Sequence, residues 1–399
     1  YTVANALSLS GTGYSSSGAL YNSHASTGAT ASGNITLAGA TTIENDGTGT
    51  LTLSGTINNA QALTITNNSS GTVALNGAVG GGTALSSIST SGKINIGANI
   101  TTSGTQAYSG AVTLTTSPTL TTTSNTITFS STVDSDSTTR SLTFGSGSGS
   151  VTFTGAVGGT NALGTITNIA GQTVTFSDAV TATTIANYGT LLFNATSAKT
   201  ISPAITDNSA TTIQVINSGN SATPGIITFS GNVAADTITI GTTTNAGSAL
   251  FNGTVLQGTT TNISIVGGNV SGEASLGNFA NTVTVTAITL NDQTGGATVQ
   301  FSGTGKTITG TIDGSAAGNG TVNISGATNT IASKIGNTYR PAQLTISGAT
   351  TFSDAVKTTA LTTTAAISNG TTLDVSGASS IGANVTTSST QTYTGAVTL

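Results

Sequence analysis

The chain of 399 residues has no cysteine, methionine or tryptophan, and charged residues make up only 5 % of it. Without cysteine it can form neither a disulfide framework nor a thiolate metal site. Its seven lysine and arginine residues are scattered, so the basic stripe that nucleic-acid binding requires is missing. No apolar run approaches the roughly 20 residues of a membrane-spanning helix. These absences exclude nucleic acid as a partner and predict no transmembrane segment.

Strong helix formers are scarce as well, whereas Thr, Ser, Ala, Gly and Asn dominate the composition. Thr, Val, Ile and Phe favour β-strands. Low charge combined with 53 glycines can indicate disorder. Here the apolar residues recur at regular positions and the mean hydropathy is +0.19, which indicates a folded core. We therefore predict an all-β chain.

A short pattern recurs along the sequence: apolar, Thr, apolar, small polar, Gly or Asp, small, Val. Four pairs of neighbouring copies begin 22–24 residues apart and two pairs begin about twice that far apart. A period in this range is typical of repeat architectures and fits one coil of a β-solenoid. The copies read LTLSGTI at 51–57, VALNGAV at 73–79, ITFSSTV at 127–133, VTFTGAV at 151–157, VTFSDAV at 174–180, ITFSGNV at 227–233, ALFNGTV at 249–255 and TTFSDAV at 350–356.

One copy shows how such a coil would fold. Because side chains alternate along a strand, Val151 and Phe153 should enter the core while Thr152 and Thr154 face solvent. Gly155 would then supply the turn. A single coil cannot bury its apolar pair, but stacked coils share a core. The structural core should include a stack of phenylalanines, Phe129, Phe153, Phe176 and Phe229.

These features predict one fold class: a single elongated, parallel, right-handed β-helix or β-solenoid built from coils of about 22–27 residues. Residues 1–399 would form one continuous repeat region of about 17 coils. The frequent asparagines, among them Asn67 and Asn68, should form side-chain ladders at the turns.

A longer repeat is also present. Residues 96–114 recur at 381–399 with fifteen of nineteen positions identical. This match predicts that the chain is a fragment of a longer tandem array. The start at Tyr1, without methionine or signal peptide, favours a processed or excised piece.

Several segments resemble the repeat regions of large bacterial exoproteins, namely filamentous-haemagglutinin-like adhesins and autotransporter passenger proteins with β-strand repeats. The resemblance implies right-handed parallel β-helix coils, secretion across an outer membrane, and a role in adhesion or in surface fibres. The segments are LSLSGTGYSSSGALYNS at 7–23, GNITLAGATTIENDGTGTLTLSGTI at 33–57, TTSGTQAYSGAVTLTTSPTLTTTSNTITFSSTVD at 101–134 and VTFTGAVGGTNAL at 151–163.

Few residues suggest catalysis or metal binding. His24, the single histidine, lies in a small polar segment typical of a turn. Glu44 with Asp46, and Asp134 with Asp136, have a spacing that puts both carboxylates on one strand face. The same pairs occur in solvated turns, so they are weak metal candidates only. We predict no catalytic residue, no cofactor-binding residue and no cofactor.

Two further functions have some support. Asp178, Asp207 and Asp236 are evenly spaced, as in a polysaccharide-acting β-helix enzyme, but almost no basic residue accompanies them. Thr-x-Thr pairs such as 237–239 and 307–309 suggest an ice-binding surface, yet they recur at uneven spacing and are replaced by Ser, Ala or Asn in many coils.

The prediction that fits the sequence best is an extracellular, secreted structural protein of the cell surface that forms a fibre, stalk or matrix filament and is not an enzyme. Its partner would be itself, in a tandem or head-to-tail filament. The alternative is an adhesin that binds a host receptor or cell-surface glycans through exposed aromatic residues. The candidates are Tyr14, Tyr21, Tyr108, Tyr188, Tyr339 and Tyr393.

Overall fold

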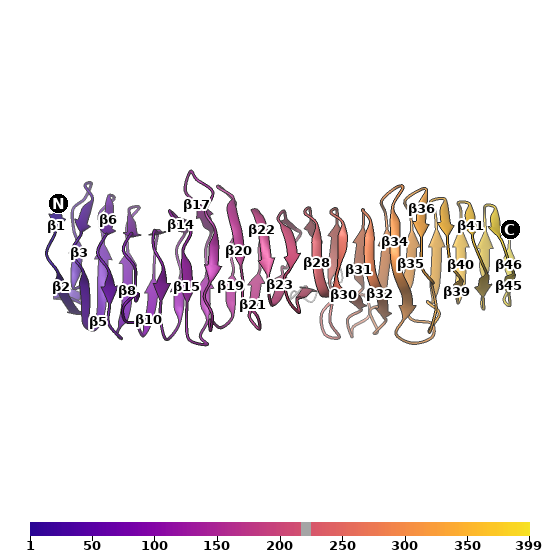
Figure 1. Ribbon diagram of the computed structural model, residues 1–399, viewed down its shortest axis with the longest axis horizontal. Helices are drawn as coiled ribbons and strands as arrows, with labels where there is room; N and C mark the ends of the chain where they lie inside the picture. Colours follow the sequence, from indigo (N-terminus) through magenta and orange to yellow (C-terminus); the bar gives the residue numbers. More distant parts are fainter. Residues whose placement is uncertain (217–224) are drawn as a thin grey trace. The chain divides into compact units, whose positions relative to one another are not determined.

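The computed structural model describes residues 1–216 and 225–399, without the side chains of 257–260. Part of the predicted continuous region, 217–224, thus lies outside the described residues. The chain divides into two compact units, Tyr1–Thr190 (unit 1) and Leu191–Leu399 (unit 2). Both consist of short parallel strands stacked as a β-solenoid, with about 17 turns of about 22 residues in all (Figure 1). This confirms the predicted all-β, parallel solenoid class.

Unit 1 has three stacks of strands, and β5 (Ile35–Asn45) turns a corner so that it pairs in two of them. The single helical element among the described residues is a 3₁₀ turn, η1 (Tyr14–Ser16). The first stack is β1 (Thr2–Val3), β4 (Ala29–Ala31), β6 (Thr50–Leu53), β9 (Thr72–Leu75), β11 (Ile94–Ile96), β14 (Val112–Leu114) and β17 (Val133–Ser135). The second is β3 (Leu20–Asn22), β5 (Ile35–Asn45), β8 (Ala62–Asn67), β10 (Ser87–Thr90), β13 (Gln106–Tyr108), β16 (Ile127–Phe129), β19 (Val151–Phe153) and β21 (Thr173–Phe176). The third is β2 (Leu7–Gly11), β7 (Ile57–Asn58), β12 (Ile100–Thr101), β15 (Thr119–Thr121), β18 (Leu142–Phe144), β20 (Leu163–Thr167) and β22 (Ala182–Asn187).

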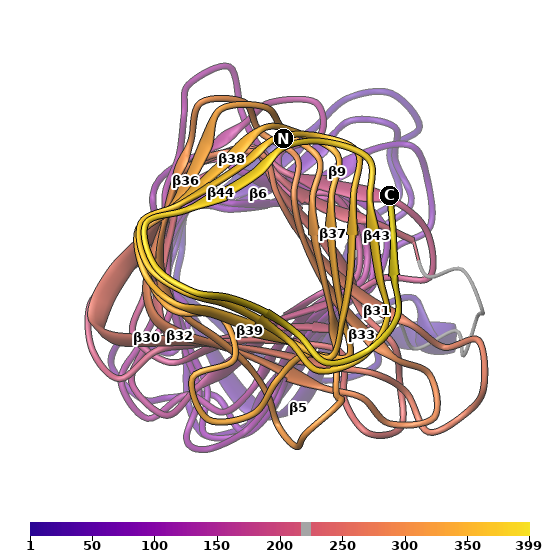
Figure 2. The same cartoon turned by 90° about the vertical axis from the view of Figure 1, so that its right-hand side faces the viewer.

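Unit 2 follows the same plan, and Figure 2 shows β39 (Val356–Thr358), β43 (Ser379–Ile381) and β44 (Val385–Thr387) on three sides of its last coils. The strand β23 (Thr190–Asn194) lies at the division between the units. The first stack is β24 (Lys199–Ile201), β27 (Ile227–Phe229), β29 (Ser248–Phe251), β31 (Ser275–Phe279), β33 (Ala297–Phe301), β35 (Thr321–Ile324), β37 (Gln343–Ile346), β40 (Ala360–Thr363), β43 (Ser379–Ile381) and β46 (Val397–Thr398). The remaining strands are β25 (Ala204–Asp207), β26 (Thr212–Ile216), β28 (Val233–Ile240), β30 (Val255–Val266), β32 (Val283–Asn291), β34 (Thr307–Gly314), β36 (Asn329–Ile331), β38 (Thr350–Phe352), β41 (Ile367–Asn369), β44 (Val385–Thr387), and then β39 (Val356–Thr358), β42 (Leu373–Val375) and β45 (Gln391–Tyr393).

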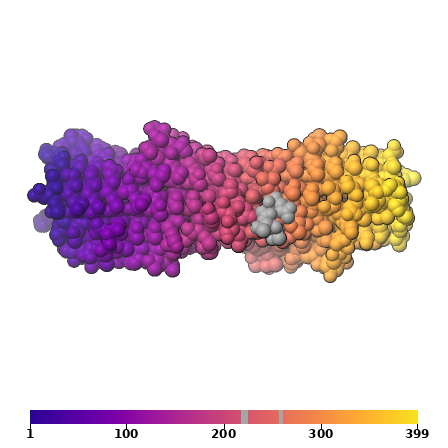
Figure 3. Space-filling model, in the orientation of Figure 1, coloured from indigo at the N-terminus to yellow at the C-terminus, as the bar shows by residue number. Residues whose placement is uncertain are grey.

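Coil length varies more than the sequence pattern predicts. In unit 1, Thr2 pairs with Thr30, a step longer than the predicted coil of about 22–27 residues. In unit 2, Gln343 pairs with Ala360, a step shorter than that range. The strands keep their register while the loops at the corners absorb the difference, and the loop after β17 stands out from unit 1 in Figure 1. In the space-filling view of Figure 3, the colours of unit 1 follow one another in bands from indigo to magenta, because each coil is completed before the next begins.

The apolar side chains of alternate strand positions fill the core. In β16, β19 and β27 the first and third residues are buried, and the Thr between them is partly exposed. All ten phenylalanines are buried. The rings of Phe129, Phe153 and Phe176 stack, with centroids 4.8 and 5.1 Å apart and planes within 3°. In unit 2, Phe229 stacks on Phe251 at 4.9 Å.

Glycine at the turn of the motif is explained by close approach between coils. Gly33, Gly55 and Gly77 lie above one another, and a Cβ on either of the last two would collide with the carbonyl oxygen of the glycine one coil before. Where the motif has aspartate, as at Asp178, its Oδ1 accepts the next backbone N–H at 2.7 Å and holds the turn.

Buried asparagines form a ladder in unit 1. Asn22 donates to Asn45 Oδ1 at 2.7 Å, and Asn45 donates to Asn67 Oδ1 at 3.3 Å. All three side chains are buried. Stacking thus satisfies amides whose burial without partners would be costly. The predicted ladder exists at Asn67, whereas Asn68 instead contacts two carboxylates.

The ring stack predicts a large difference between neighbouring residues of β19. Replacing Phe153 with Ala should cost about 3–5 kcal/mol, because it leaves a cavity between two stacked rings. Replacing Thr152 with Ala should cost less than about 1 kcal/mol, because its side chain faces outward. Denaturant titration with hydrogen exchange of β16, β19 and β21 measures both. A larger loss for the Thr152 variant would contradict this assignment of inner and outer faces.

Candidate functional sites

Glu44 and Asp46 lie on the same side of the coil at the end of β5, as their spacing predicts. Asn68, one coil further on, donates to Glu44 Oε1 at 2.9 Å and to Asp46 Oδ1 at 3.1 Å. On the other side, Tyr21 donates its hydroxyl proton to Asp46 Oδ2 at 2.8 Å. The pair therefore belongs to a network that links three successive coils.

The Glu44 carboxyl lies in surroundings that disfavour its charged form. Its side chain is buried. Burial raises its pKa, the charge of Asp46 and a hydrogen bond with it raise the pKa further, and the bond from Asn68 opposes the shift. The hydrogen bond to Asp46 also raises the pKa of Tyr21. The protonated form of Glu44 is therefore favoured, and the polar contacts of both side chains with neighbouring coils are with the neutral donors Tyr21 and Asn68.

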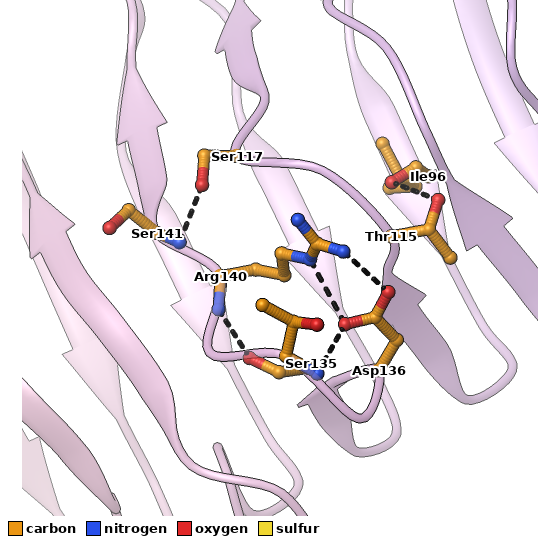
Figure 4. Close-up of polar contacts among 8 residues, drawn as sticks. Ile96, Thr115, Ser117, Ser135, Asp136, Arg140 and Ser141 are labelled. Carbon is orange, nitrogen blue, oxygen red and sulfur yellow. Dashed lines mark hydrogen bonds and ion pairs between the residues drawn. The ribbon is translucent and has the colours of Figure 1, made fainter.

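Asp134 and Asp136 bond in different directions. Asp134 Oδ1 accepts the backbone N–H groups of Thr160 and Asn161 at 2.8 and 3.3 Å, which fixes a turn of the next coil. Asp136 accepts two hydrogen bonds from Arg140, at 2.9 and 2.8 Å (Figure 4). This bond to Arg140 lowers the pKa of Asp136 and neutralises its charge. Both carboxylates thus serve to hold loops.

Two of the three regularly spaced aspartates meet at one threonine. Thr211 donates its hydroxyl proton to Asp207 at 2.9 Å and its backbone N–H to Asp236 at 3.1 Å. Asp178, in unit 1, holds its own turn. The contacts of Asp207 and Asp236 at Thr211 hold the chain between β25 and β26, which is a structural use.

His24 caps a turn and borders a cavity. Its Nδ1 accepts the backbone N–H of Thr27 at 3.1 Å and lies 2.7 Å from the Thr27 hydroxyl. The cavity has a volume of about 360 Å³, and its wall includes Tyr1, Tyr21 and Ala31 as well as His24. The ring of His24 lies 5.7 Å from that of Tyr1. An apolar wall with aromatic rings and a few polar groups is the usual composition of a small-ligand pocket.

The tyrosines divide into exposed and buried. Tyr14, Tyr21, Tyr188 and Tyr339 are exposed as expected. Tyr108 is not available to a partner, which corrects its place among the exposed aromatic candidates. It is 0 % exposed, stacks on Phe129 at 4.9 Å, and donates to Gln106 Oε1 at 2.9 Å.

The described residues contain neither a cluster of metal-binding side chains nor a membrane-spanning helix. Within 1–216 and 225–399, no three His, Cys, Asp or Glu side chains gather as they would to hold a metal ion. The same residues include no helix with the length and apolarity needed to cross a membrane.

The side of unit 1 formed by β8, β10, β13, β16, β19 and β21 carries a regular array of hydroxyl groups, which we call the hydroxyl face. Register stacks the outward residues of six coils in three columns. All eighteen side chains are partly or fully exposed, and sixteen are Thr or Ser. The central column is Thr64, Ser89, Ala107, Thr128, Thr152 and Thr175. The flanking columns are Ala62, Ser87, Thr105, Thr126, Ser150 and Thr173, and Thr66, Ser91, Ser109, Ser130, Thr154 and Ser177.

The sequence pattern did not predict this array, because the residues of one column are irregularly spaced along the sequence. The step from Thr128 to Thr152 is longer than the step from Ser89 to Ala107, yet both pairs are in register. Uneven spacing in the sequence is therefore compatible with aligned hydroxyl positions on this face. The repeated buried residues could have predicted the array. Where Phe129 aligns with Phe153, the outward-facing residues next to them in the sequence, Thr128 and Thr152, must align as well.

Comparison with protein-family models, with curated proteins and with solved structures found no match to this chain.

The Glu44 carboxyl predicts a pH effect. Because folding raises its pKa above the ordinary value near 4.5, the folded state holds the proton more tightly than the unfolded chain. The free energy of unfolding should therefore fall as the pH rises from about 4.5 through the higher pKa that Glu44 has in the folded state. Glu44→Gln keeps a neutral donor towards Asp46 and should lack that fall. Thermal melts from pH 4 to pH 8 compare the two, and a wild type that gains stability over the variant with rising pH would refute the assignment.

The contacts of the other carboxylates predict independence of calcium. Asp134 and Asp136 are already satisfied by backbone N–H groups and by Arg140. The melting temperature should not change when a chelator is added or when calcium is restored. A melting temperature that collapses with chelator, and recovers with calcium but not with magnesium, would promote one of the two acidic pairs to a metal site.

Proposed function

We propose that this chain is a secreted, extracellular structural protein whose coils stack into a surface fibre, stalk or matrix filament, without catalysis. The observation that carries the proposal is the repeated segment 96–114 and 381–399. The first copy forms β12, β13 and β14 inside unit 1, and the second forms β44, β45 and β46 in unit 2. One sequence thus builds the same coil in two places.

The two copies share their internal hydrogen bonds. Gln106 donates to the carbonyl of Ile100 at 3.2 Å, and Gln391 donates to that of Val385 at 3.1 Å. Tyr393 donates to Gln391 Oε1 at 3.1 Å, as Tyr108 does to Gln106. The coil is therefore a module that keeps the same polar contacts wherever it occurs.

The first copy shows what packs against such a coil. It is covered by the coil of β15, β16 and β17, whose Phe129 stacks on Tyr108. Because the second copy has the same strands and nearly the same residues, a further coil of this kind is the partner that suits it. That coil would belong to a next tandem unit or to another copy of the chain.

Mechanical load would be shared along such a stack, since the coils are joined to their neighbours by parallel ladders. Ion pairs add ties across coils. Arg340 contacts the Asp374 carboxylate at 2.5 Å, two coils away, and also bonds the carbonyl of Asp374 at 3.0 Å. With only seven Lys and Arg residues, the chain offers few sites to proteases that cut after basic residues, which suits life outside the cell.

A second candidate is an adhesin that binds a host receptor or glycan, favoured by the cavity beside His24. Its volume of about 360 Å³ suits one or two sugar rings, and Tyr1 and Tyr21 provide aromatic surface. A glycan array probed with the wild type and with Tyr21→Ala separates the candidates. Saturable binding that Tyr21→Ala removes would favour the adhesin over the fibre.

Assembly tests the fibre directly. Electron microscopy and sedimentation of the purified chain at rising concentration should reveal filaments. Val397→Lys places a charge on the strand β46 and should shorten or abolish them. Val270→Lys is the matched control, because Val270 is 49 % exposed and lies outside the strands. Equal effects of the two substitutions would contradict stacking at β46.

A second experiment tests whether the covering coil belongs to a next tandem unit of the same polypeptide. Extending the chain after Leu399 with residues 115–136, which cover the first copy, should slow amide hydrogen exchange in β44, β45 and β46. A scrambled extension of the same composition should not. If the natural extension gives no protection and the original chain stays monomeric, the fibre proposal fails.

A further inference from the structure

The hydroxyl groups of the hydroxyl face are unused by the fold. None of the sixteen Thr and Ser side chains has a hydrogen-bond partner within the described part of the chain. Elsewhere hydroxyls are bonded, as Thr102 is to the carbonyl of Gly104 at 2.7 Å and Thr358 to that of Ala360 at 3.0 Å. The face therefore presents donors and acceptors in a repeating net to whatever lies outside it.

The side chains beneath the net keep a constant spacing and orientation from coil to coil. The rings beneath it, Tyr108, Phe129, Phe153 and Phe176, are 4.9, 4.8 and 5.1 Å apart. Their successive planes differ by 12°, 3° and 3°. The near-parallel rings show that β13, β16, β19 and β21 present their core side chains in the same orientation from one coil to the next. Rows of hydroxyls thus repeat at the ring spacing.

Along each strand, outward residues are two positions apart, about 6.6 Å in parallel strands. The hydroxyl face therefore has two regular repeats at right angles. The oxygen atoms on a prism face of ice also form a rectangular net, with repeats comparable to these. Each Thr adds a methyl group beside its hydroxyl, so the face can both bond water and order it around apolar groups.

The chemistry of the face argues against other occupants. Its eighteen positions include no charged residue, so an acidic or basic partner finds no complement there. They also include no aromatic or arginine, the residues that anchor most protein interfaces, and no ring on which a sugar could stack. A neutral, hydrogen-bonding lattice is the partner that a neutral, periodic hydroxyl net complements.

We propose that the hydroxyl face of unit 1 binds the surface of ice. The binding is separate from the stacking of coils proposed above, since it uses outward side chains and leaves the strand ladders and the end coils unchanged. A fibre with such a face would hold ice at the cell surface or slow the growth of ice crystals there.

Partition into ice tests the proposal with the full chain. Ice is grown slowly from a dilute solution, and the protein in the ice is compared with that in the liquid. Growth of small crystals near the melting point is followed in parallel. The wild type should enter ice several-fold more than a non-binding protein of similar size and should slow crystal growth.

Two matched pairs of substitutions locate the binding. Thr128→Lys with Thr152→Lys alters adjacent coils in the central column of the hydroxyl face. Thr119→Lys with Thr143→Lys alters adjacent, equally half-buried positions on another side of unit 1. Only the first pair should reduce partition to the background level. Thr128→Ser with Thr152→Ser keeps both hydroxyls and should retain part of the binding.

The outcomes decide between the occupants. Partition of the wild type at background, or equal losses from both lysine pairs at unchanged melting temperature, would overturn the proposal. So would a change in oligomeric state confined to the first pair and without any effect on ice, which would make the face an interface between copies. Filament formation is measured separately, so either proposal can fail alone.

Discussion

Parallel, in-register pairing between successive coils is the constraint on which the structure depends. Backbone groups of each strand bond to the strands of adjacent coils, so side chains lie over their counterparts one coil away. Like therefore stacks on like. Phe153 lies between two phenylalanines, Asn45 between two asparagines, and Gly55 over Gly33. A residue type that fits one position of a coil therefore also fits the same position of the next coil, which explains why the sequence repeats.

The fold could be predicted because alternation and turn chemistry are local. Val151, Thr152, Phe153 and Gly155 define an inner face, an outer face and a corner without any knowledge of the neighbours. What depends on the neighbours could not be predicted as well. Tyr108 lies among polar residues in the sequence, yet both it and Gln106 point inward and satisfy each other. Its position in the motif, the one that Phe129 occupies in the next coil, was the clue.

The candidate acidic sites show the same division. The spacing of Glu44 and Asp46 correctly predicts a shared face, but their partners Tyr21 and Asn68 come from the coils on either side. Asp134 likewise bonds backbone N–H groups of the following coil. Such contacts between coils can be predicted only when the register of the strands is known. They show that carboxylates spaced like metal ligands in the sequence instead hold neighbouring coils together.

The variation in coil length has a consequence for how such chains diverge. The long coil that leads from Thr2 to Thr30 and the short coil that leads from Gln343 to Ala360 each keep their strands in register, because the corners take up the difference. An insertion at a corner shifts the numbering of everything downstream but moves no strand. Two solenoids with identical cross-sections can therefore lose alignable sequence quickly, while their cores and outer faces stay superimposable.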